Sequence, residues 1–402
     1  MAKQITSTAV PRVRFPEFRK AKAWGKKPFS RLFTVGNGRD YKHLGSGSVP
    51  VYGSGGYMLS VNDYLYDGES VCIGRKGTIN NPFFLSGKFW TVDTLFYTHS
   101  FRDCLPFFIY LHFQNIDWLK HNEAGGVPSL SKSNIEKIEV SIPSLAEQQK
   151  IADCLTSLDE VIAAQGRKVE ALKAHKRGLM QQLFPREGET RPRLRFPEFR
   201  NAPEWSVHPF DYFVTRSFYG TSSSTSDRGR YPVLRMGNMF DGGLSFSNLA
   251  YLDLDPESFE GIRLLPGDIL LNRTNSPALV GKISLFDSDI ECITASYIVT
   301  YRLDRERINS VFCNLMLNTP NYQAKVNALA RPSVSQANIN PTTFRKELVV
   351  SVPKLAEQQR IADCLSSFDA KITAETEQLA ALKTHKQGLM QQLFPVPEVA
   401  DA

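Results

Sequence analysis

The segment LAEQQKIADCLTSLDEVIAAQGRKVEALKAHKRGLMQQLFP runs from Leu145 to Pro185 and returns, identical at about two positions in three, from Leu355 to Pro395. The two copies are 210 residues apart. A second pair of matching segments, RVRFPEFRKAKAW from Arg12 and RLRFPEFRNAPEW from Arg193, is separated by only 181 residues. The second unit therefore carries 29 additional residues between Trp205 and Leu355. Matching ends with unlike middles indicate a tandem duplication.

Each copy predicts one long helix with an apolar stripe. Steps of four and three residues visit ten positions in each copy, and eight of the ten are apolar, which is the heptad pattern of paired helices. Proline precedes each copy and ends it, as expected at helix boundaries. The expected packing positions are Ile151, Leu155, Leu158, Ile162, Val169, Leu172, Leu179 and Leu183, and Ile361, Leu365, Phe368, Ile372, Leu379, Leu382, Leu389 and Leu393.

The two helices are expected to pack against each other. A helix of about 40 residues is about 60 Å long, and so narrow a stripe buries little against a globular domain. We therefore expect an antiparallel pair in which Lys386 faces Gln165 and Lys176 faces Glu375, because these polar residues interrupt the stripe at matching places. The alternative is that these four residues are simply exposed.

The start of the first helix carries a second signal. Ser144 and Glu147 have the spacing of a capping box, in which each side chain bonds the other residue's backbone N–H. Lys354 replaces the serine in the second copy. We therefore expect the cap to differ between the copies.

Composition predicts folded domains. The chain has 402 residues, 42% of them hydrophobic, which suits two or three domains. No apolar run approaches a membrane span, and the opening MAKQITSTAVP lacks the features of a secretory signal, so we expect a cytoplasmic protein with no membrane partner. The six cysteines have no metal-ligand spacing and are expected to be free thiols without a metal site.

The net charge of +7 is unevenly distributed. Residues 1–143 hold 18 basic and 11 acidic side chains, and ten of the basic ones lie between Arg12 and Lys42. Lysine and arginine favour polyanions because they displace phosphate counterions. The alternative is an ordinary solvated basic face.

The middle regions alternate short β-type runs with Gly, Pro, Asn and Ser clusters, which predicts two α+β globular domains. Their polar loops hold the residue types that read bases, since Arg pairs with guanine and Asn or Gln with adenine. Any one loop of this composition is more often a solvated turn. The candidate DNA-binding residues are Arg75, Lys76, Lys88, Lys132, Arg235, Asn238, Asn272, Arg273, Thr274, Asn275, Lys282, Ser333, Ser335 and Gln336.

The sequence shows no catalytic constellation. The segment from Asn81 to Phe84 lacks the second proline of the N-P-P-[YF] motif of amino-methyltransferases. GRKGT at residues 74–78 lacks the spacing of a phosphate-binding P-loop. We therefore expect no catalytic residues and no metal site in this chain.

The motifs PSLAEQQKIA and PKLAEQQRIA, the helix ends LKxHKxGLMQQLFP and the two RFPEF segments together resemble the specificity subunit of a type I restriction-modification system. The resemblance covers residues 12–395. It implies an α+β fold in which two globular target recognition domains are joined by two long antiparallel coiled-coil helices, a pseudo-two-fold tandem repeat. The expected boundaries are 1–143 for the first recognition domain, 144–185 for the central helix, 186–192 for a linker, 193–352 for the second domain, 353–395 for the C-terminal helix and 396–402 for a tail.

The resemblance also implies a function. Each domain would read one half of a bipartite site in double-stranded DNA, and the helices would set the spacer and dock two methylation subunits and the restriction subunits. S-adenosylmethionine, ATP and Mg would be bound by those partners, with no cofactor in this chain. The rival readings are a stand-alone DNA methyltransferase or nuclease, and a coiled-coil scaffold that binds protein and not DNA.

Overall fold

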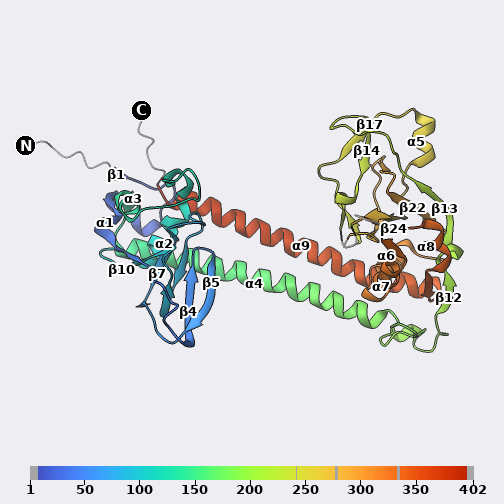
Figure 1. The fold of residues 1–402 in the computed structure, drawn as a ribbon, viewed down its shortest axis with the longest axis horizontal. Helices are drawn as coiled ribbons and strands as arrows, with labels where there is room; N and C mark the ends of the chain where they lie inside the picture. Colours follow the sequence, from blue (N-terminus) through green and yellow to red (C-terminus); the bar gives the residue numbers. More distant parts are fainter. Residues whose placement is uncertain (1–7, 241, 277–278, 333–335, 396–402) are drawn as a thin grey trace, which may run out of the picture. The chain divides into compact units, whose positions relative to one another are not determined.

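The computed structural model describes residues 8–240, 242–276, 279–332 and 336–395, which form two compact units (Figure 1). Unit 1 combines residues up to 167 with those from 376 onward, and unit 2 is residues 168–375. Each unit therefore holds one globular domain and half of each long helix. The sequence predicts the helices as separate segments between the domains, whereas here both units share each helix.

Unit 1 contains three small sheets, ordered β1-β2-β11, β3-β10-β7-β8 and β5-β4-β9-β6. Its strands are β1 (Thr8–Ala9), β2 (Trp24–Pro28), β3 (Thr34–Asn37), β4 (Ser46–Gly53), β5 (Gly56–Val61), β6 (Tyr66–Asp67), β7 (Ser70–Gly74), β8 (Phe83–Leu85), β9 (Lys88–Thr91), β10 (Leu95–His99) and β11 (Glu139–Ile142). Its helices are α1 (Phe29–Leu32), α2 (Pro106–Asn115), α3 (Lys132–Lys137) and the first part of α4 (Leu145–Leu183).

Unit 2 contains sheets ordered β12-β25, β13-β22-β18-β20, β17-β14-β21, β15-β16 and β19-β24-β23. Its strands are β12 (Ser206–Pro209), β13 (Val214–Tyr219), β14 (Tyr231–Leu234), β15 (Met239–Phe240), β16 (Gly243–Leu244), β17 (Ala250–Leu252), β18 (Asp268–Asn272), β19 (Thr274–Asn275), β20 (Ile283–Phe286), β21 (Ile293–Thr294), β22 (Ile298–Leu303), β23 (Ala330–Pro332), β24 (Ala337–Ile339) and β25 (Val349–Val352). Its helices are α5 (Pro256–Ile262), α6 (Ser310–Leu317), α7 (Pro320–Ala328), α8 (Pro341–Glu347) and the first part of α9 (Leu355–Leu393).

The two globular domains share one framework although their sequences differ. In each, an antiparallel four-stranded sheet has the same order, β3-β10-β7-β8 in unit 1 and β13-β22-β18-β20 in unit 2. In each, a second sheet contains one parallel pair of strands. In unit 1 these are β4 and β9, with Val51 opposite Trp90, and in unit 2 they are β14 and β21, with Val233 opposite Ile293. The duplication therefore includes the middles, which the sequence comparison left unmatched.

The long helices are antiparallel partners within each unit, but the expected register is wrong. In unit 1 the Lys386 ammonium lies 2.6 Å from the Asp159 carboxylate. In unit 2 Lys176 lies 2.6 Å from Asp369, while Glu375 pairs with Lys168 at 2.6 Å. The real partners of both lysines lie six residues earlier than expected. The whole pairing is shifted by about one heptad, because the Gln165 amide lies 3.5 Å from Gln378 and not opposite Lys386.

The expected packing residues are all buried or half-buried. Burial is deepest where the helices meet the domains: Ile151, Leu155 and Leu393 belong to the core of unit 1, and Leu183, Ile361 and Leu365 belong to the core of unit 2. The stripe is therefore anchored to the globular domains at its ends as well as to the other helix.

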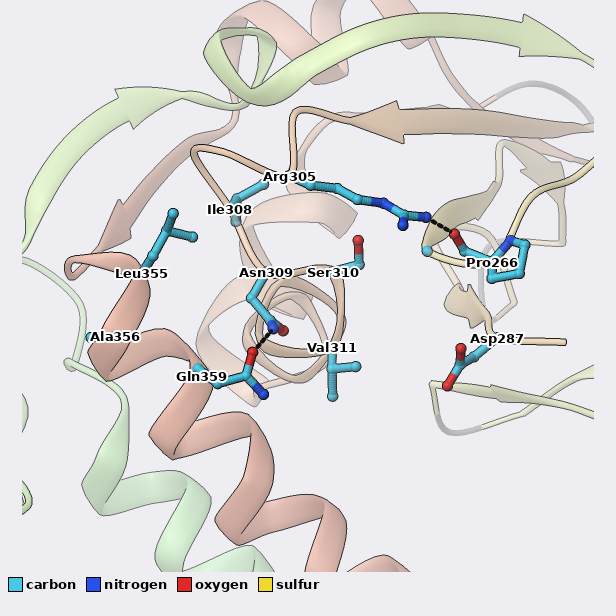
Figure 2. A pocket seen from close by; sticks show the side chains of 11 residues that line it. Pro266, Asp287, Arg305, Ile308, Asn309, Ser310, Val311, Leu355, Ala356 and Gln359 are labelled. Carbon is cyan, nitrogen blue, oxygen red and sulfur yellow. Dashed lines mark hydrogen bonds between the residues drawn. The ribbon is translucent and has the colours of Figure 1, made fainter.

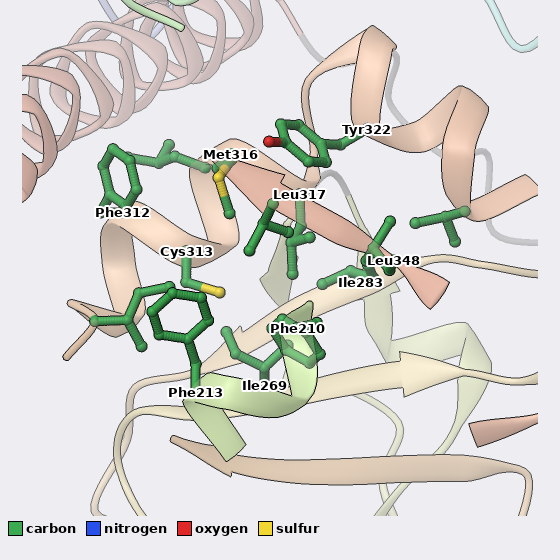
Figure 3. Close-up of a cluster of buried hydrophobic side chains, with 14 of the residues drawn as sticks. Phe210, Phe213, Ile269, Ile283, Phe312, Cys313, Met316, Leu317, Tyr322 and Leu348 are labelled. Carbon is green, nitrogen blue, oxygen red and sulfur yellow. The ribbon is translucent and has the colours of Figure 1, made fainter. Parts of the chain in front are cut away.

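An aromatic cluster closes each core. In unit 1 the rings of Trp24 and Phe108 pack against Phe394, with Phe108 and Phe394 stacked at 5.4 Å. In unit 2 Trp205, Phe312 and Phe184 repeat the arrangement, with Phe184 and Phe312 also 5.4 Å apart. Figure 3 shows Phe312 with other side chains of the unit 2 core. The phenylalanine of the repeated GLMQQLFP segment is therefore a core residue in both units.

A buried ion pair ties the RFPEF segment to the start of each helix. Arg14 donates two hydrogen bonds of 2.7 Å to Glu147, and Arg195 donates two of 2.6 Å to Glu357. These bonds raise the pKa of both guanidinium groups. The expected capping box is only half formed, because Ser144 Oγ accepts from the Glu147 N–H at 3.4 Å while the Glu147 carboxylate binds Arg14.

A buried histidine in unit 1 is expected to make the stability of that unit depend on pH. His112 packs against Phe108 and Phe394, and burial lowers its pKa to about 3. Its unfolded pKa is near 6.5, so the unfolded state takes up the proton first. Stability conferred by neutral His112 is therefore complete above pH 6.5 and is lost as the pH falls toward 3.

We expect unit 1 to lose up to about 1.4 kcal/mol of stability per pH unit below pH 6.5 through this residue. Met316 occupies the equivalent place on α6 in unit 2, so His112→Met is a natural replacement. Thermal unfolding of the full chain between pH 7 and pH 5 should show a smaller decline for His112→Met. Equal declines in the two proteins would contradict this assignment.

Candidate nucleic-acid interface

An arginine follows the central strand of each domain and is fixed by the same backbone hydrogen bonds. In unit 1 the Arg75 N–H donates to the Thr94 carbonyl at 2.8 Å, and the Arg75 carbonyl accepts from the Leu130 N–H at 2.9 Å. In unit 2 the Arg273 N–H donates to Tyr297 at 3.0 Å, and the Arg273 carbonyl accepts from Ile339 at 2.8 Å. Arg75 and Arg273 are therefore structural equivalents.

The two arginine side chains lie near aromatic rings. The Arg75 guanidinium carbon is 5.9 Å from the centre of the Phe96 ring, and one of its nitrogens donates weakly to the Asp93 carbonyl at 3.4 Å. The Arg273 guanidinium carbon is 5.5 Å from the centre of the exposed Tyr219 ring. Arg273 Nε is buried and has no hydrogen-bond partner among the residues that the structure describes.

We call residues 75–78 in unit 1 and 273–276 in unit 2 the arginine loops, and a turn lies beside each of them. In unit 1 it is Gly53–Gly56, where a φ of +108° at Gly56 favours glycine. In unit 2 it is Arg235–Asn238, which begins at the same point of the framework: the Ala295 N–H donates to Leu234 as the Val92 N–H donates to Tyr52, both at 3.0 Å. We call these two segments the variable turns.

The variable turns lie close to the arginine loops in both domains. A Cβ built on Gly77 would lie 3.3 Å from Ser54 Oγ in unit 1. In unit 2 the Asn275 amide nitrogen lies 3.0 Å from Met236 Sδ. Turn and arginine loop thus form one surface in each domain.

Each surface borders a hollow. The one in unit 1 has a volume of about 680 Å³ and is lined by the variable turn, Tyr57, Lys42 and residues 92–94. The one in unit 2 has about 440 Å³ and is lined by the variable turn, Phe240, Asn248 and Tyr297. Tyr57 is 63% exposed and Phe240 is 50% exposed. Exposed aromatic rings can stack on unpaired bases, and arginine and lysine side chains bind the phosphates of single-stranded and duplex nucleic acid.

The prediction of DNA binding is wrong for two residues, Asn238 and Asn272. Asn238 is 4% exposed, and its amide is used up by the Arg235 N–H and by the carbonyls of Ser245 and Ser247. Asn272 is fully buried in β18 and donates to the Leu279 carbonyl. Both asparagines hold loops in place and are not accessible to DNA.

The other predicted residues are distributed as follows. Arg75 and Lys76 are exposed in one loop, while Arg273, Thr274 and Asn275 are half-buried in the equivalent loop. Gln336 is exposed next to Ala337, the strand partner of Asn275.

Lysines account for most of the rest. Lys282 is half-buried beside Asn272, and its carbonyl accepts from the Asn272 N–H. Lys132 pairs with Glu136 at 3.6 Å. Lys88 lies at the opposite end of β9 from the hollow, with its ammonium over the Tyr64 ring. Ser333 and Ser335 lie outside the described residues.

Sequence reasoning missed the aromatic members of these surfaces, Tyr57, Tyr219, Phe240 and Tyr297. It also missed Ser54 and the equivalence of the two turns. The segments VPVYGSGG and YPVLRMGN share one weak signal of this equivalence, because in each a β-type run is followed by a turn.

Within the described ranges, no group of three or more metal-ligating side chains is close enough to hold an ion. Over the same ranges, no helix has the length and apolarity needed to cross a bilayer. The surfaces described above are the best candidates for a functional site.

Comparison with known proteins identifies the family. Residues 22–174 and 216–384 match the family described as the type I restriction modification DNA specificity domain, and each match covers most of one globular domain. The chain belongs to this family. As a member it is a specificity subunit with two recognition domains that recognise DNA, and it is not itself an enzyme.

Individual relatives agree with this assignment. The chain is 24% identical to the type I restriction enzyme MjaVIII specificity subunit of Methanocaldococcus jannaschii over 349 residues, which cover 84% of this chain and 79% of that one. A second relative in the same organism is 28% identical over 176 residues, or 43% of this chain and 41% of its own length.

Two solved structures share the fold of this specificity subunit. The type I restriction-modification S subunit from M. genitalium aligns with a TM-score of 0.61 at 13% identity, covering 96% of this chain and 99% of that one. A chain from a study of complex assembly and conformational transition of the type I system aligns with a TM-score of 0.57 at 13% identity, covering 92% and 97%.

Proposed function

We propose that this specificity subunit recognises a bipartite site in duplex DNA, one half-site per domain, with a spacer set by α4 and α9. It docks two methylation subunits and the restriction subunits of its complex in the cytoplasm. The observation that carries the proposal is the repetition of one framework with unlike surface loops. Two domains with the same framework but different surface loops can recognise two different DNA sequences.

The test is a map of modified bases in host DNA by single-molecule sequencing, with the gene intact and deleted. We expect deletion to remove methyl-adenine from one split motif. The control is re-expression of the intact gene, which should restore the motif. A map that deletion leaves unchanged, while the methylation subunit is shown to be produced, would contradict the proposal.

The rival reading as a protein-binding scaffold predicts a different result. It leaves the basic segment between Arg12 and Lys42 and the arginine-aromatic surfaces without a role. Binding of the purified complex to duplex DNA should fall steeply with salt if phosphates are neutralised. Binding that is absent at low salt would favour the scaffold.

The partner surface is indicated by residues that are repeated but exposed. Repeated residues inside the core are explained by packing, whereas repeated residues on the surface are not. Leu145 and its equivalent Leu355 are 51% and 37% exposed. We call the exposed start of each helix, with the nearby RFPEF segment, the repeat face: Glu17, Leu145, Gln149, Lys150 and Asp153 in unit 1, and Glu198, Leu355, Gln359, Arg360 and Asp363 in unit 2.

The repeat faces have the same local bonds. Gln149 donates to Asp153, and Gln359 to Asp363, both at 2.7 Å. Lys150 pairs with Glu17 at 3.2 Å, and Arg360 with Glu198 at 3.1 Å. Two matching surfaces, one on each unit, suit two copies of one partner chain.

In unit 2 the repeat face borders a hollow of about 540 Å³ (Figure 2). Leu355 and Gln359 of α9 lie on one side of it, and Asn309 at the start of α6 donates to Gln359 Oε1 at 2.8 Å. An exposed leucine beside a hollow is a plausible anchor point for an apolar side chain of a methylation subunit.

We expect Leu145→Arg and Leu355→Arg each to remove one methylation subunit from the complex, and the double variant to remove both, because each change places a charge in one interface. Native mass spectrometry of the co-purified complex measures the number of subunits. Val161→Lys is the matched control, since Val161 is equally exposed but is a lysine, Lys371, in the second copy. A double variant that keeps both partners would contradict docking at the repeat faces.

Cofactor binding is assigned to the partners. S-adenosylmethionine, ATP and Mg would be held by the methylation and restriction subunits, with none required by this chain. Equilibrium dialysis of the isolated specificity subunit with S-adenosylmethionine tests this assignment, and saturable binding would contradict it.

A further inference from the structure

Comparison of the two recognition surfaces separates residues that position the DNA from residues that determine which bases are recognised. Both surfaces are built on one framework, so each position in one has an equivalent in the other. If the domains read different half-sites, residues that are the same in both cannot carry the difference. Residues that differ at the same framework position can carry it. This reasoning rests on the proposed function.

The shared residue is the arginine of the arginine loop, Arg75 in unit 1 and Arg273 in unit 2. Both are placed by the same pair of backbone hydrogen bonds, and both guanidinium groups lie near an aromatic ring. Arg75 is exposed, and Arg273 is half-buried beside the exposed Tyr219 ring. A phosphate oxygen is an acceptor that every DNA sequence provides.

The variable turns differ most where the framework is the same. The first is Gly-Ser-Gly-Gly and has no long side chain, whereas the second is Arg-Met-Gly-Asn. Gly53 is buried at the position equivalent to Arg235, which is exposed at the edge of the hollow in unit 2. A long donor side chain is therefore present in the second domain alone at this position.

Hydrogen bonds hold both the backbone and the guanidinium group of Arg235 in place. Its N–H donates to the buried Asn238 side chain at 2.9 Å, and the Asn238 amide donates to the carbonyls of Ser245 and Ser247 at 3.1 Å each. One guanidinium nitrogen of Arg235 donates to the Asn248 carbonyl at 3.2 Å. A guanidinium group fixed at one end has donors left for a planar acceptor pair, and guanine offers one in its O6 and N7 atoms.

We propose that Arg75 and Arg273 bind the phosphate backbone of the two half-sites, whereas Arg235 pairs with a guanine base of the second half-site. Asn238 is a positioning residue for Arg235. The first domain has no counterpart of this contact, so its half-site is read by other groups of its surface.

The test compares Arg235→Ala with Arg273→Ala in the full complex with the methylation subunits. Arg235→Ala is expected to make one guanine position of the second half-site degenerate in the methylation map, with a roughly 10- to 100-fold loss of discrimination, and to leave the first half-site unchanged. Arg273→Ala is expected to leave the motif unchanged and to weaken binding to all duplexes alike. Its plot of log affinity against log salt should be shallower by about one.

Arg230→Ala is the matched control. Arg230 is also an exposed arginine of unit 2, but it precedes β14 and its guanidinium lies over the Tyr231 ring at 5.0 Å. It should preserve both the motif and the salt dependence. Arg235→Lys keeps the positive charge but lacks the forked donors, so it should make the same base position degenerate. This second variant keeps the proposal testable if Arg235→Ala does not fold.

An unchanged motif in both Arg235 variants would overturn the proposal, as would a base preference altered by Arg273→Ala. Failure of the proposed function would look different, because the wild-type gene itself would then direct no methylated motif.

Discussion

Substitution of Glu357 by alanine should destabilise unit 2 by about 3–5 kcal/mol, because it leaves the Arg195 guanidinium buried and unpaired. The Arg195 and Glu357 side chains are 6% and 2% exposed, and the two bonds between them are 2.6 Å long. For a unit of this size the loss corresponds to a fall of about 10 °C in the unfolding temperature. Calorimetry of the full chain measures it.

Two further variants test whether the loss comes from the buried ion pair. Glu198→Ala removes the exposed pair with Arg360 in the same unit and should change the unfolding temperature little. Combining Arg195→Met with Glu357→Leu should recover much of the loss, since a buried pair can often be replaced by apolar side chains. A Glu357→Ala variant as stable as Glu198→Ala would show that the pair is not needed for stability.

Insertion of one heptad into both long helices should lengthen the DNA spacer and leave the half-sites unchanged. The insertion points are between Arg167 and Lys168 in α4 and between Glu375 and Thr376 in α9, where the units divide. Seven residues add about 10 Å of helix, which corresponds to about three base pairs. The methylation map of cells that express the variant gives the new spacer directly.

The matched control is the same insertion in α4 alone. One helix then no longer equals the other in length, so the pairs Lys386–Asp159 and Lys176–Asp369 cannot both form. This variant should unfold at a lower temperature and should methylate poorly. A double insertion that folds but retains the original spacer would contradict the idea that the helices act as a ruler.

Much of the fold was predictable because repetition and heptad spacing are local properties of the sequence. The two long helices, their antiparallel pairing and the α+β character of the middles followed from such patterns. The register did not follow, because several polar pairings along a heptad stripe have similar energies. Lys386 binds Asp159 and not Gln165, and no spacing rule distinguishes those two partners.

The candidate site was less predictable. Arginine and lysine in glycine loops could be selected by residue type, but Asn238 and Asn272 were selected for the same reason and are buried. Whether an amide side chain holds a loop or faces solvent depends on distant carbonyls such as that of Ser247. The equivalence of Arg75 and Arg273 became visible only through their backbone bonds, because the surrounding residues have diverged.

The division of the chain between the units has a consequence for synthesis on the ribosome. Unit 2 is one continuous stretch and can fold once residue 375 has emerged. Unit 1 needs Leu393 and Phe394 to complete its core, so Trp24 and Phe108 lack these partners until residue 394 has emerged. Chains that stop before residue 394 would expose this aromatic surface to chaperones and proteases.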